Sequence, residues 1–149
     1  MQAEYKRANV ADIPTLVSLM REFYAHEELV FDEAVARHAL LGLLENEAYG
    51  RAYLISQQGE LVGYTVLTLG YSLEFGGVDA LVDELYLREA ARGQGLGREA
   101  LEFLADTCRA LGVRAVHLVV EHQNTRAHAV YRRFGFQDEP RHLMTKWLL

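Results

Sequence analysis

Glycine occupies every second position in Arg92-Gly93-Gln94-Gly95-Leu96-Gly97. A backbone without Cβ atoms can come close to a ligand. Apolar residues at helical spacing follow over residues 96–111, so this turn is predicted to open a helix. The first N–H groups of a helix lack partners and carry partial positive charge, which favours phosphate binding. A tight turn without a ligand is the alternative explanation for these glycines.

Two adjacent carboxylates, Asp83 and Glu84, come shortly before the turn. Residues 81–87 alternate as in a strand, with Leu81, Asp83, Leu85 and Leu87 on one side and Val82, Glu84 and Tyr86 on the other. One of the two carboxylates is therefore expected to face a cleft, unless a bulge intervenes. Either is a candidate general base, and a solvated or salt-bridged acidic pair is the alternative.

Length and composition place these residues in a single domain, 1–149, with half of its residues apolar and a net charge of -6. The acidic charge argues against nucleic-acid or membrane partners and favours a cationic small molecule. No apolar run is long enough to span a bilayer, and the single cysteine, Cys108, excludes an intrachain disulfide, so we expect a cytoplasmic chain. The six histidines lack metal-binding spacing, and no metal is expected.

The other elements follow from periodicity and caps. Helices are predicted after caps at Asp12, Asp32 and Asn124 and from Leu96; strands are predicted at 5–8, 51–56, 61–71, 81–87, 115–120 and 142–148, with a hairpin turn at Gln58-Gly59 and a loop over 73–78. This order predicts an α/β fold with a mixed, mostly antiparallel sheet and flanking helices. One right-handed parallel crossover would pass through the helix that the glycine turn opens.

Two motifs resemble those of the GNAT superfamily of acyl-CoA-dependent N-acetyltransferases. The turn at residues 92–97 resembles its pyrophosphate-binding signature R/Q-x-x-G-x-G/A, and residues 124–136 resemble its second signature, N-x-x-A-x-x-x-Y-x-x-x-G-F. Residues 71–87 are most similar to the diamine (spermidine/spermine-type) branch. Asp83 stands where that branch usually has Glu, and its shorter side chain favours contact with substrate through a water; Glu89 stands where the family often has Pro.

The resemblance implies acetyl-CoA as the cofactor, without a metal. Backbone N–H groups of the turn would bind the pyrophosphate together with Arg92 or Arg98, and the pantetheine arm would pair with the strand at 85–87 if that strand splays from its parallel neighbour. The residues implied to bind the cofactor are Leu85, Tyr86, Leu87, Arg92, Gly93, Gln94, Gly95, Leu96, Gly97, Arg98, Asn124, Ala127 and Tyr131.

The resemblance further implies direct transfer of an acetyl group to a primary amine, small and cationic or polyamine-like. Asp83 is the favoured base, with Glu84 as the alternate, and Tyr131 is the general acid for the leaving thiolate. Glu27 and His26, at the acidic end of the first helix, are the candidates for binding the amine together with Asp83. For Tyr131 the alternative is packing alone, and for Glu27 it is a solvated surface position.

Other functions are left open at this point. A protein N-terminus or lysine is an alternative acceptor, and a non-catalytic acyl-CoA-binding module would carry the same turn. A dinucleotide-binding module is less consistent, because the third glycine of G-x-G-x-x-G is missing and no second βαβ half follows. The family often forms dimers, so a homodimer is expected.

Overall fold

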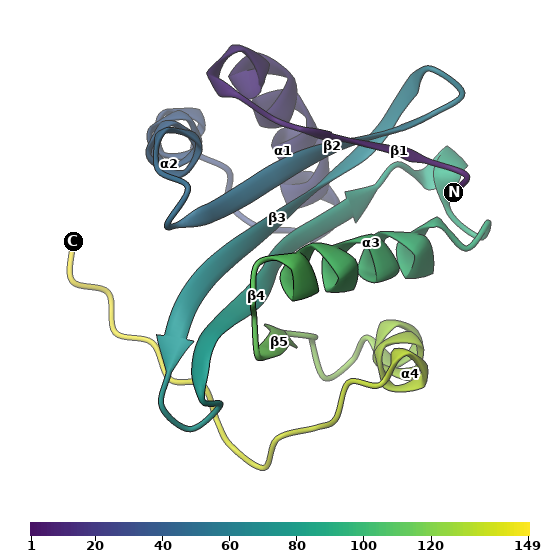
Figure 1. Ribbon diagram of the computed structural model, residues 1–149. Helices are drawn as coiled ribbons and strands as arrows, with labels where there is room; N and C mark the ends of the chain where they lie inside the picture. The colour runs from purple at the N-terminus through teal and green to yellow at the C-terminus, as the bar shows by residue number, and fades with distance from the viewer. The chain divides into compact units, whose positions relative to one another are not determined.

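The computed structural model describes residues 1–149, which form two compact units, Met1–Val119 and Val120–Leu149. The first unit contains strands β1 (Glu4–Arg7), β2 (Gly50–Gln57), β3 (Glu60–Ser72), β4 (Gly77–Leu87) and β5 (Ala115–Leu118), helices α1 (Ile13–His26), α2 (Glu33–Glu45) and α3 (Leu96–Ala110), and the single turns η1 (Val10–Asp12) and η2 (Glu89–Ala91) (Figure 1). The second unit contains α4 (Thr125–Phe134). None of the helices is both long and apolar enough to cross a membrane.

The five strands form one sheet in the order β1-β2-β3-β4-β5. Neighbours from β1 to β4 are antiparallel, and β4 and β5 are parallel. The predicted α/β fold, with a mostly antiparallel sheet and one parallel pair connected by a helix, is confirmed. The predicted hairpin turn is also present, with Gln58 and Gly59 both at positive φ (52° and 79°).

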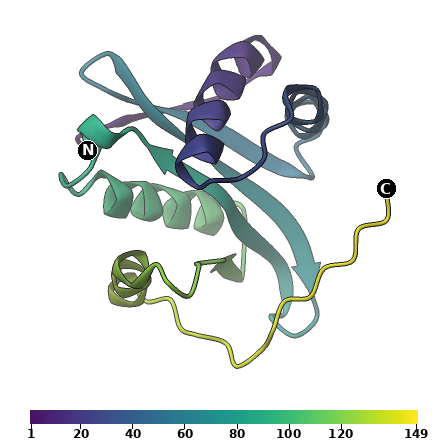
Figure 2. The same cartoon turned by 180° about the vertical axis from the view of Figure 1, so that it is seen from behind.

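Helices cover both faces of this sheet, α3 on the near face in Figure 1 and α1 and α2 on the near face in Figure 2. Side chains alternate between the two sides along β2, as the pleat requires. Ala52 and Leu54 pack in the core beneath α1 and α2. Tyr53 and Ile55 pack in the clusters that contain α3 residues. The middle of the sheet is therefore covered on both faces, which explains the continuous buried run Ala52–Ile55 in β2.

A β-bulge in β4 breaks this alternation at Asp83. Val66 of β3 pairs with Glu84 and Leu67 pairs with Val82, so Asp83 is an extra residue without a partner. Before the bulge, Val82 packs on the α3 side, whereas after it Tyr86 packs on the side of α1 and α2. The predicted alternation, with Val82 and Tyr86 on one side, is thus wrong, because the extra residue reverses the facing of the strand.

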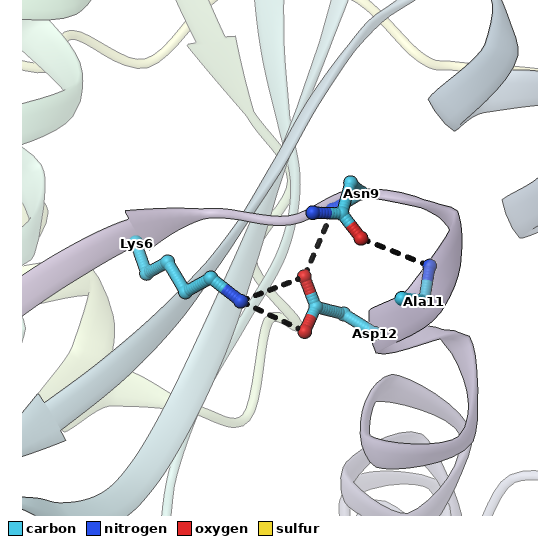
Figure 3. Close-up of polar contacts among 4 residues, drawn as sticks. All are labelled: Lys6, Asn9, Ala11 and Asp12. Carbon is cyan, nitrogen blue, oxygen red and sulfur yellow. Dashed lines mark hydrogen bonds and ion pairs between the residues drawn. The ribbon is translucent and has the colours of Figure 1, made fainter.

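The start of α1 differs from the prediction as well. Asp12 makes no side-chain cap to α1; instead Asn9 and Asp12 form a capping box around η1 (Figure 3). Oδ1 of Asn9 accepts from the N–H of Ala11 at 2.9 Å, and Asp12 accepts from the N–H of Asn9 at 2.9 Å and from Nζ of Lys6 at 3.0 Å. The backbone hydrogen bond from Asn9, with help from Lys6, lowers the pKa of Asp12. The predicted caps at Asp32 and Asn124 are confirmed.

The predicted strand at residues 142–148 is absent. Residues 141–149 have no regular secondary structure, and Leu143, Met144, Trp147 and Leu148 are exposed. A strand is stabilised only when a neighbour pairs with its backbone, and the alternating pattern of this segment cannot supply that neighbour. Elsewhere β4 begins at Gly77, inside the predicted loop, and β5 ends at Leu118.

Candidate active site

The glycine turn between β4 and α3 has the backbone conformation that its sequence predicts. Gly93 and Gly95 have φ of +76° and +81°, a region that costs other residues about 1–2 kcal/mol. A Cβ atom added at either position would meet no heavy atom within 4 Å. The two glycines are therefore required by the backbone, and they leave the space beside the turn open.

Backbone donors are free along the whole turn. None of the protein's hydrogen bonds has an N–H group of residues 93–98 as its donor, and the first bond into α3 runs from the N–H of Glu99 to the carbonyl of Gly95 at 3.1 Å. Consecutive unpaired N–H groups at the start of a 15-residue helix form a binding site for an anion. The turn thus has the donors that a pyrophosphate group needs.

Side chains around the turn hold it against the end of β4. Nε of Arg92 donates to the carbonyl of Leu87 at 2.8 Å, and its guanidinium group lies over the Tyr86 ring, 5.8 Å from the centroid. Nε2 of Gln94 donates to the carbonyl of Ala90 at 3.1 Å. Arg98 is exposed and pairs with Glu102 one helical turn further along. Arg92 is thereby placed beside the free N–H groups, while Arg98 is engaged on the helix surface.

One edge of β4 is open next to the turn. The ladder between β4 and β5 ends at Val82 and Leu118, although β4 continues to Leu87 and remains paired with β3 up to that residue. Residues 83–87 therefore expose their backbone on the β5 side. An extended, amide-rich chain can add to such an edge by main-chain hydrogen bonds. This is the splayed arrangement that the cofactor's pantetheine arm would require.

A pocket of about 400 Å³ lies between the two N-terminal helices and the sheet. Its residues come from α1, α2, β3 and β4 and the segment after α2: Met20, Tyr24, His38, Ala39, Leu40, Gly42, Leu43, Tyr49, Val66, Thr68, Asp83 and Glu84. Most of these are apolar or aromatic. Both carboxylates reach the same pocket, because the bulge at Asp83 removes the alternation that would have separated them.

Glu84 is held firmly by two tyrosine hydroxyls. Tyr24 of α1 donates to Oε2 of Glu84, and Tyr64 of β3 donates to Oε1 at 2.8 Å. The fully buried Thr65 hydroxyl donates to the Glu84 carbonyl at 2.8 Å. Burial raises the pKa of Glu84, and the charge of Asp83 adds to this, whereas the two phenol hydrogen bonds oppose it. The same burial, together with Glu84, raises the pKa of both tyrosines, so they keep their protons.

Asp83 differs from its neighbour in having a free carboxyl group. It makes no hydrogen bond and no ion pair, and the residue as a whole is exposed. The atoms that surround its carboxyl group nevertheless remove enough water to raise its pKa. A carboxylate that is free of partners and has a raised pKa can accept a proton. Of the two candidate bases, Asp83 is the one whose carboxyl group has no hydrogen-bond partner.

The end of α1 lies next to Arg92 of the glycine turn. Nε2 of His26 lies 3.5 Å from Nη1 of Arg92, and Glu27 is exposed at the end of the helix. Neither residue lines the pocket that contains the two carboxylates. One turn earlier, Glu22 accepts from Nη2 of Arg88 at 2.9 Å, and this pairing lowers the pKa of Glu22. The pair fastens α1 to the segment that follows β4.

The two tyrosines that hold Glu84 were not predicted as site residues. Tyr24 was predicted only as part of the helix after Asp12, and Tyr64 only as part of the strand at 61–71. Both assignments are compatible with the structure, since each ring packs in or against the core beneath α1 and α2. A tyrosine at a core position can indicate such a contact. Phenylalanine would fill the same space, and a buried hydroxyl group needs a hydrogen-bond partner.

The second unit contains the residues of the second motif. Oδ1 of Asn124 accepts from the N–H of Ala127 at 3.2 Å and so caps α4, and Gly135 ends the helix at φ +110°. Tyr131 lies on α4 with its ring 6.1 Å from that of Phe136, at a steep angle. Capping and ring packing thus account for the local structure of this motif.

Comparison with known proteins gives matches that extend over most of the chain. Residues 14–136 match the model of the acetyltransferase (GNAT) family. The chain is 26% identical over 142 residues to the L-methionine sulfoximine/L-methionine sulfone acetyltransferase of Pseudomonas aeruginosa, covering 92% of this chain and 81% of the relative. It is 39% identical to an integron cassette protein from the mobile metagenome of Cole Harbour Salt Marsh, with a TM-score of 0.86 over 97% of this chain and 90% of the other.

A more distant structural match carries a ligand. The predicted acetyltransferase from Clostridium acetobutylicum, whose crystal structure contains acetyl-CoA, superimposes with a TM-score of 0.82 at 17% identity, over 97% of this chain and 96% of the other. At that identity the match concerns the fold. The fold of the present chain is therefore one on which acetyl-CoA is bound in a relative.

Proposed function

Because the chain belongs to the acetyltransferase (GNAT) family and is an acyl-CoA-dependent N-acetyltransferase, we propose that its acceptor is a small primary amine that binds in the pocket of Asp83 and Glu84. The observation that carries this proposal is the bulge at Asp83, which brings two adjacent carboxylates into one largely apolar pocket. The two carboxylates attract an ammonium group. Because the pKa of each carboxyl group is raised, a carboxylate in this pocket can take up a proton from the amine.

The two carboxylates have different tasks in this proposal. A primary amine is protonated at neutral pH and has to lose a proton before its nitrogen can attack the acetyl carbon. Asp83, which has no other partner, accepts that proton directly or through a water. Glu84 stays in place between Tyr24 and Tyr64, and its fixed charge orients the ammonium group.

The turn and the open strand edge hold acetyl-CoA, which supplies the acetyl group as a thioester. The free N–H groups of residues 93–98 and the side chain of Arg92 bind the pyrophosphate. Residues 85–87 pair with the pantetheine arm along the open edge of β4. The strand leads from the pocket to the turn, so the acetyl group would be delivered next to Asp83.

Tyr131 completes the reaction as the general acid. When the new C–N bond forms and the C–S bond breaks, the sulfur leaves as a thiolate and the phenol of Tyr131 gives it a proton. The second proton that the nitrogen loses on becoming an amide passes to solvent, from which the phenolate regains its own. A phenol keeps its proton at neutral pH and is acidic enough for this transfer. The support for this role, and for cofactor contacts of Asn124 and Ala127, is the match of residues 124–136 to the family's second motif.

The acceptor is tested by following thiol release from acetyl-CoA with a panel of primary amines, peptides with free N-termini and lysine peptides, with each acetylated product identified by mass. We expect transfer to small amines. Transfer only to peptides would contradict the proposed substrate class. Binding of CoA, measured separately by calorimetry, distinguishes an inactive preparation from a non-catalytic acyl-CoA-binding module, which would bind CoA and acetylate none of the panel.

A further inference from the structure

We propose that the acceptor carries one ammonium group on an apolar body, without a carboxylate, and that Gly42 provides the space for the far end of that body. This proposal rests on the proposed function, because it concerns the same pocket. It narrows the acceptor from small cationic amines in general, among them polyamines, to monoamines with an alkyl or aryl chain.

The charges in the pocket provide for only one ammonium group. Its two acidic residues, Asp83 and Glu84, are adjacent in the chain, and no other carboxylate lines the pocket. The second ammonium group of a diamine would leave these residues and lie against Leu40, Leu43 or Met20. Burying a charge without a partner there is strongly unfavourable. A diamine is therefore expected to bind less well than a monoamine of equal length.

The same charges disfavour acetylation of the α-amino group of an amino acid. The pocket is lined by neither lysine nor arginine, and its one basic side chain is that of His38, on α2. A carboxylate on the carbon that bears the reacting amine would be held close to Asp83 and Glu84. Like charges at such distances repel one another. The Pseudomonas aeruginosa relative is named for amino-acid substrates, which carry a carboxylate beside the amine. The present pocket has no lysine or arginine to pair with such a carboxylate.

The remainder of the pocket is suited to an apolar chain. Met20 and Leu40 belong to the core beneath α1 and α2, where Leu43 also packs, and Tyr24 and Tyr49 add two aromatic rings to the lining. Each methylene group that moves from water into such surroundings strengthens binding by about fourfold. Chain length should therefore raise the catalytic efficiency until the pocket is filled.

Gly42 is the position that leaves this space. It lies within helix α2 and lines the pocket, and a Cβ atom added there would meet no heavy atom within 4 Å. Its φ lies outside the left-handed region, so the backbone does not require glycine, and glycine inside a helix is less favourable than alanine. Gly42 is exposed, so a larger side chain there would occupy part of the open space beside the pocket, and the helix itself does not require glycine at this position.

Matched pairs of acceptors test the charge argument. The value of kcat/KM for acetyl transfer is measured with phenethylamine and phenylalanine, which differ by one carboxylate, and with hexylamine and 1,6-diaminohexane, which differ by one ammonium group. We expect the monoamine of each pair to be preferred by about tenfold or more. An equal or reversed preference in either pair overturns the proposal.

A substitution at Gly42 tests the space. In Gly42→Leu the loss of kcat/KM should grow along the series propylamine, hexylamine, octylamine, reaching about tenfold or more for octylamine. The control is Ala34→Leu, an exposed position of α2 that does not line the pocket, which should leave the whole series unchanged. Melting temperatures of both variants check that each is folded.

The outcomes separate this inference from the proposed function. If amines are acetylated but the diamine or amino acid is preferred, or if Gly42→Leu affects all chain lengths equally, the inference is wrong and the proposed function stands. If CoA binds and no amine of the panel is acetylated, the proposed function itself is wrong, and the inference with it.

Discussion

The hydroxyl group of Tyr64 donates a 2.8 Å hydrogen bond to Oε1 of Glu84 across the β3–β4 pair. Tyr64 is fully buried, so this bond fixes the carboxylate from beneath the pocket, while Tyr24 holds its other oxygen from α1. Asp83, one residue earlier, has no comparable partner. Two adjacent carboxylates thus differ in their hydrogen bonding, and this difference is the basis for assigning them different roles.

Replacing Tyr64 by phenylalanine should destabilise the protein. The variant leaves Oε1 of a half-buried, charged carboxylate without its donor, and loss of such a hydrogen bond costs about 1.5–3 kcal/mol. Urea unfolding at neutral pH measures the change. Tyr24→Phe is the control, because Tyr24 is only partly buried and a water can replace its hydroxyl, so a smaller loss is expected. Equal stability of Tyr64→Phe and the wild type would contradict the role of this bond.

Asp83→Asn should stabilise the protein at neutral pH. Desolvation raises the pKa of Asp83 in the folded state above its unfolded value near 3.9, so the folded state binds the proton more tightly. The contribution of Asp83 to the free energy of unfolding is therefore fully present below about pH 4 and is lost as the pH rises through the raised pKa. Asparagine carries no charge to desolvate.

Thermal unfolding of the wild type and of Asp83→Asn, between about pH 4 and pH 7, checks the predicted effect of Asp83 on stability. The melting temperature of Asp83→Asn should exceed that of the wild type at pH 7, and the difference should shrink as the pH falls towards about 4. A variant that is less stable than the wild type at pH 7 would show that the folded state favours the ionised form of Asp83, contrary to the desolvation argument.

Gly95→Asp should abolish binding of CoA. The substitution adds a negative charge where the free N–H groups of the turn would bind the pyrophosphate. Gly95→Ala is the matched control: no atom lies within 4 Å of its Cβ, so it introduces only the strain of φ +81°, about 1–2 kcal/mol. Calorimetric titration with CoA should show a much weaker affinity for the aspartate variant than for the alanine variant. Similar affinities would refute this placement of the pyrophosphate.

Tyr131→Phe should lower kcat for acetyl transfer far more than it weakens binding of CoA. A residue that only donates a proton in the transition state contributes to turnover and little to ground-state binding. Steady-state kinetics and calorimetry on the same preparations give the two quantities. The opposite pattern, a weaker CoA affinity with unchanged kcat, would make Tyr131 a packing or binding residue.

Local signals predicted most of the fold and the backbone conformation of the glycine turn. Helical periods, the Asp32 and Asn124 caps and the Gln58-Gly59 turn each depend on a few neighbouring residues, and the structure contains all of them. The positive φ of Gly93 and Gly95 likewise follows from residue type. Such features can be predicted because the chain within one element determines them.

Features that depend on distant residues were not predictable in the same way. The bulge at Asp83 is defined by the register with β3 and is accompanied by a hydrogen bond from Thr65, so nothing within β4 alone reveals it. The strand predicted at residues 142–148 failed for the same reason, since a pairing partner lies outside the segment. The contact of His26 with Arg92, which is distant in the sequence, was likewise not predictable, and the role of His26 in binding the amine stays a prediction.

The central claim is that Asp83 accepts the proton of the amine. The most direct test measures kcat as a function of pH, at saturating acetyl-CoA and amine, for the wild type, Asp83→Asn and Glu84→Gln. We predict that Asp83→Asn lowers kcat by about 10²–10⁴-fold and removes the rise of kcat with pH that ionisation of the base produces, while Glu84→Gln keeps that rise. Wild-type kcat and an unchanged pH profile in Asp83→Asn would contradict the account.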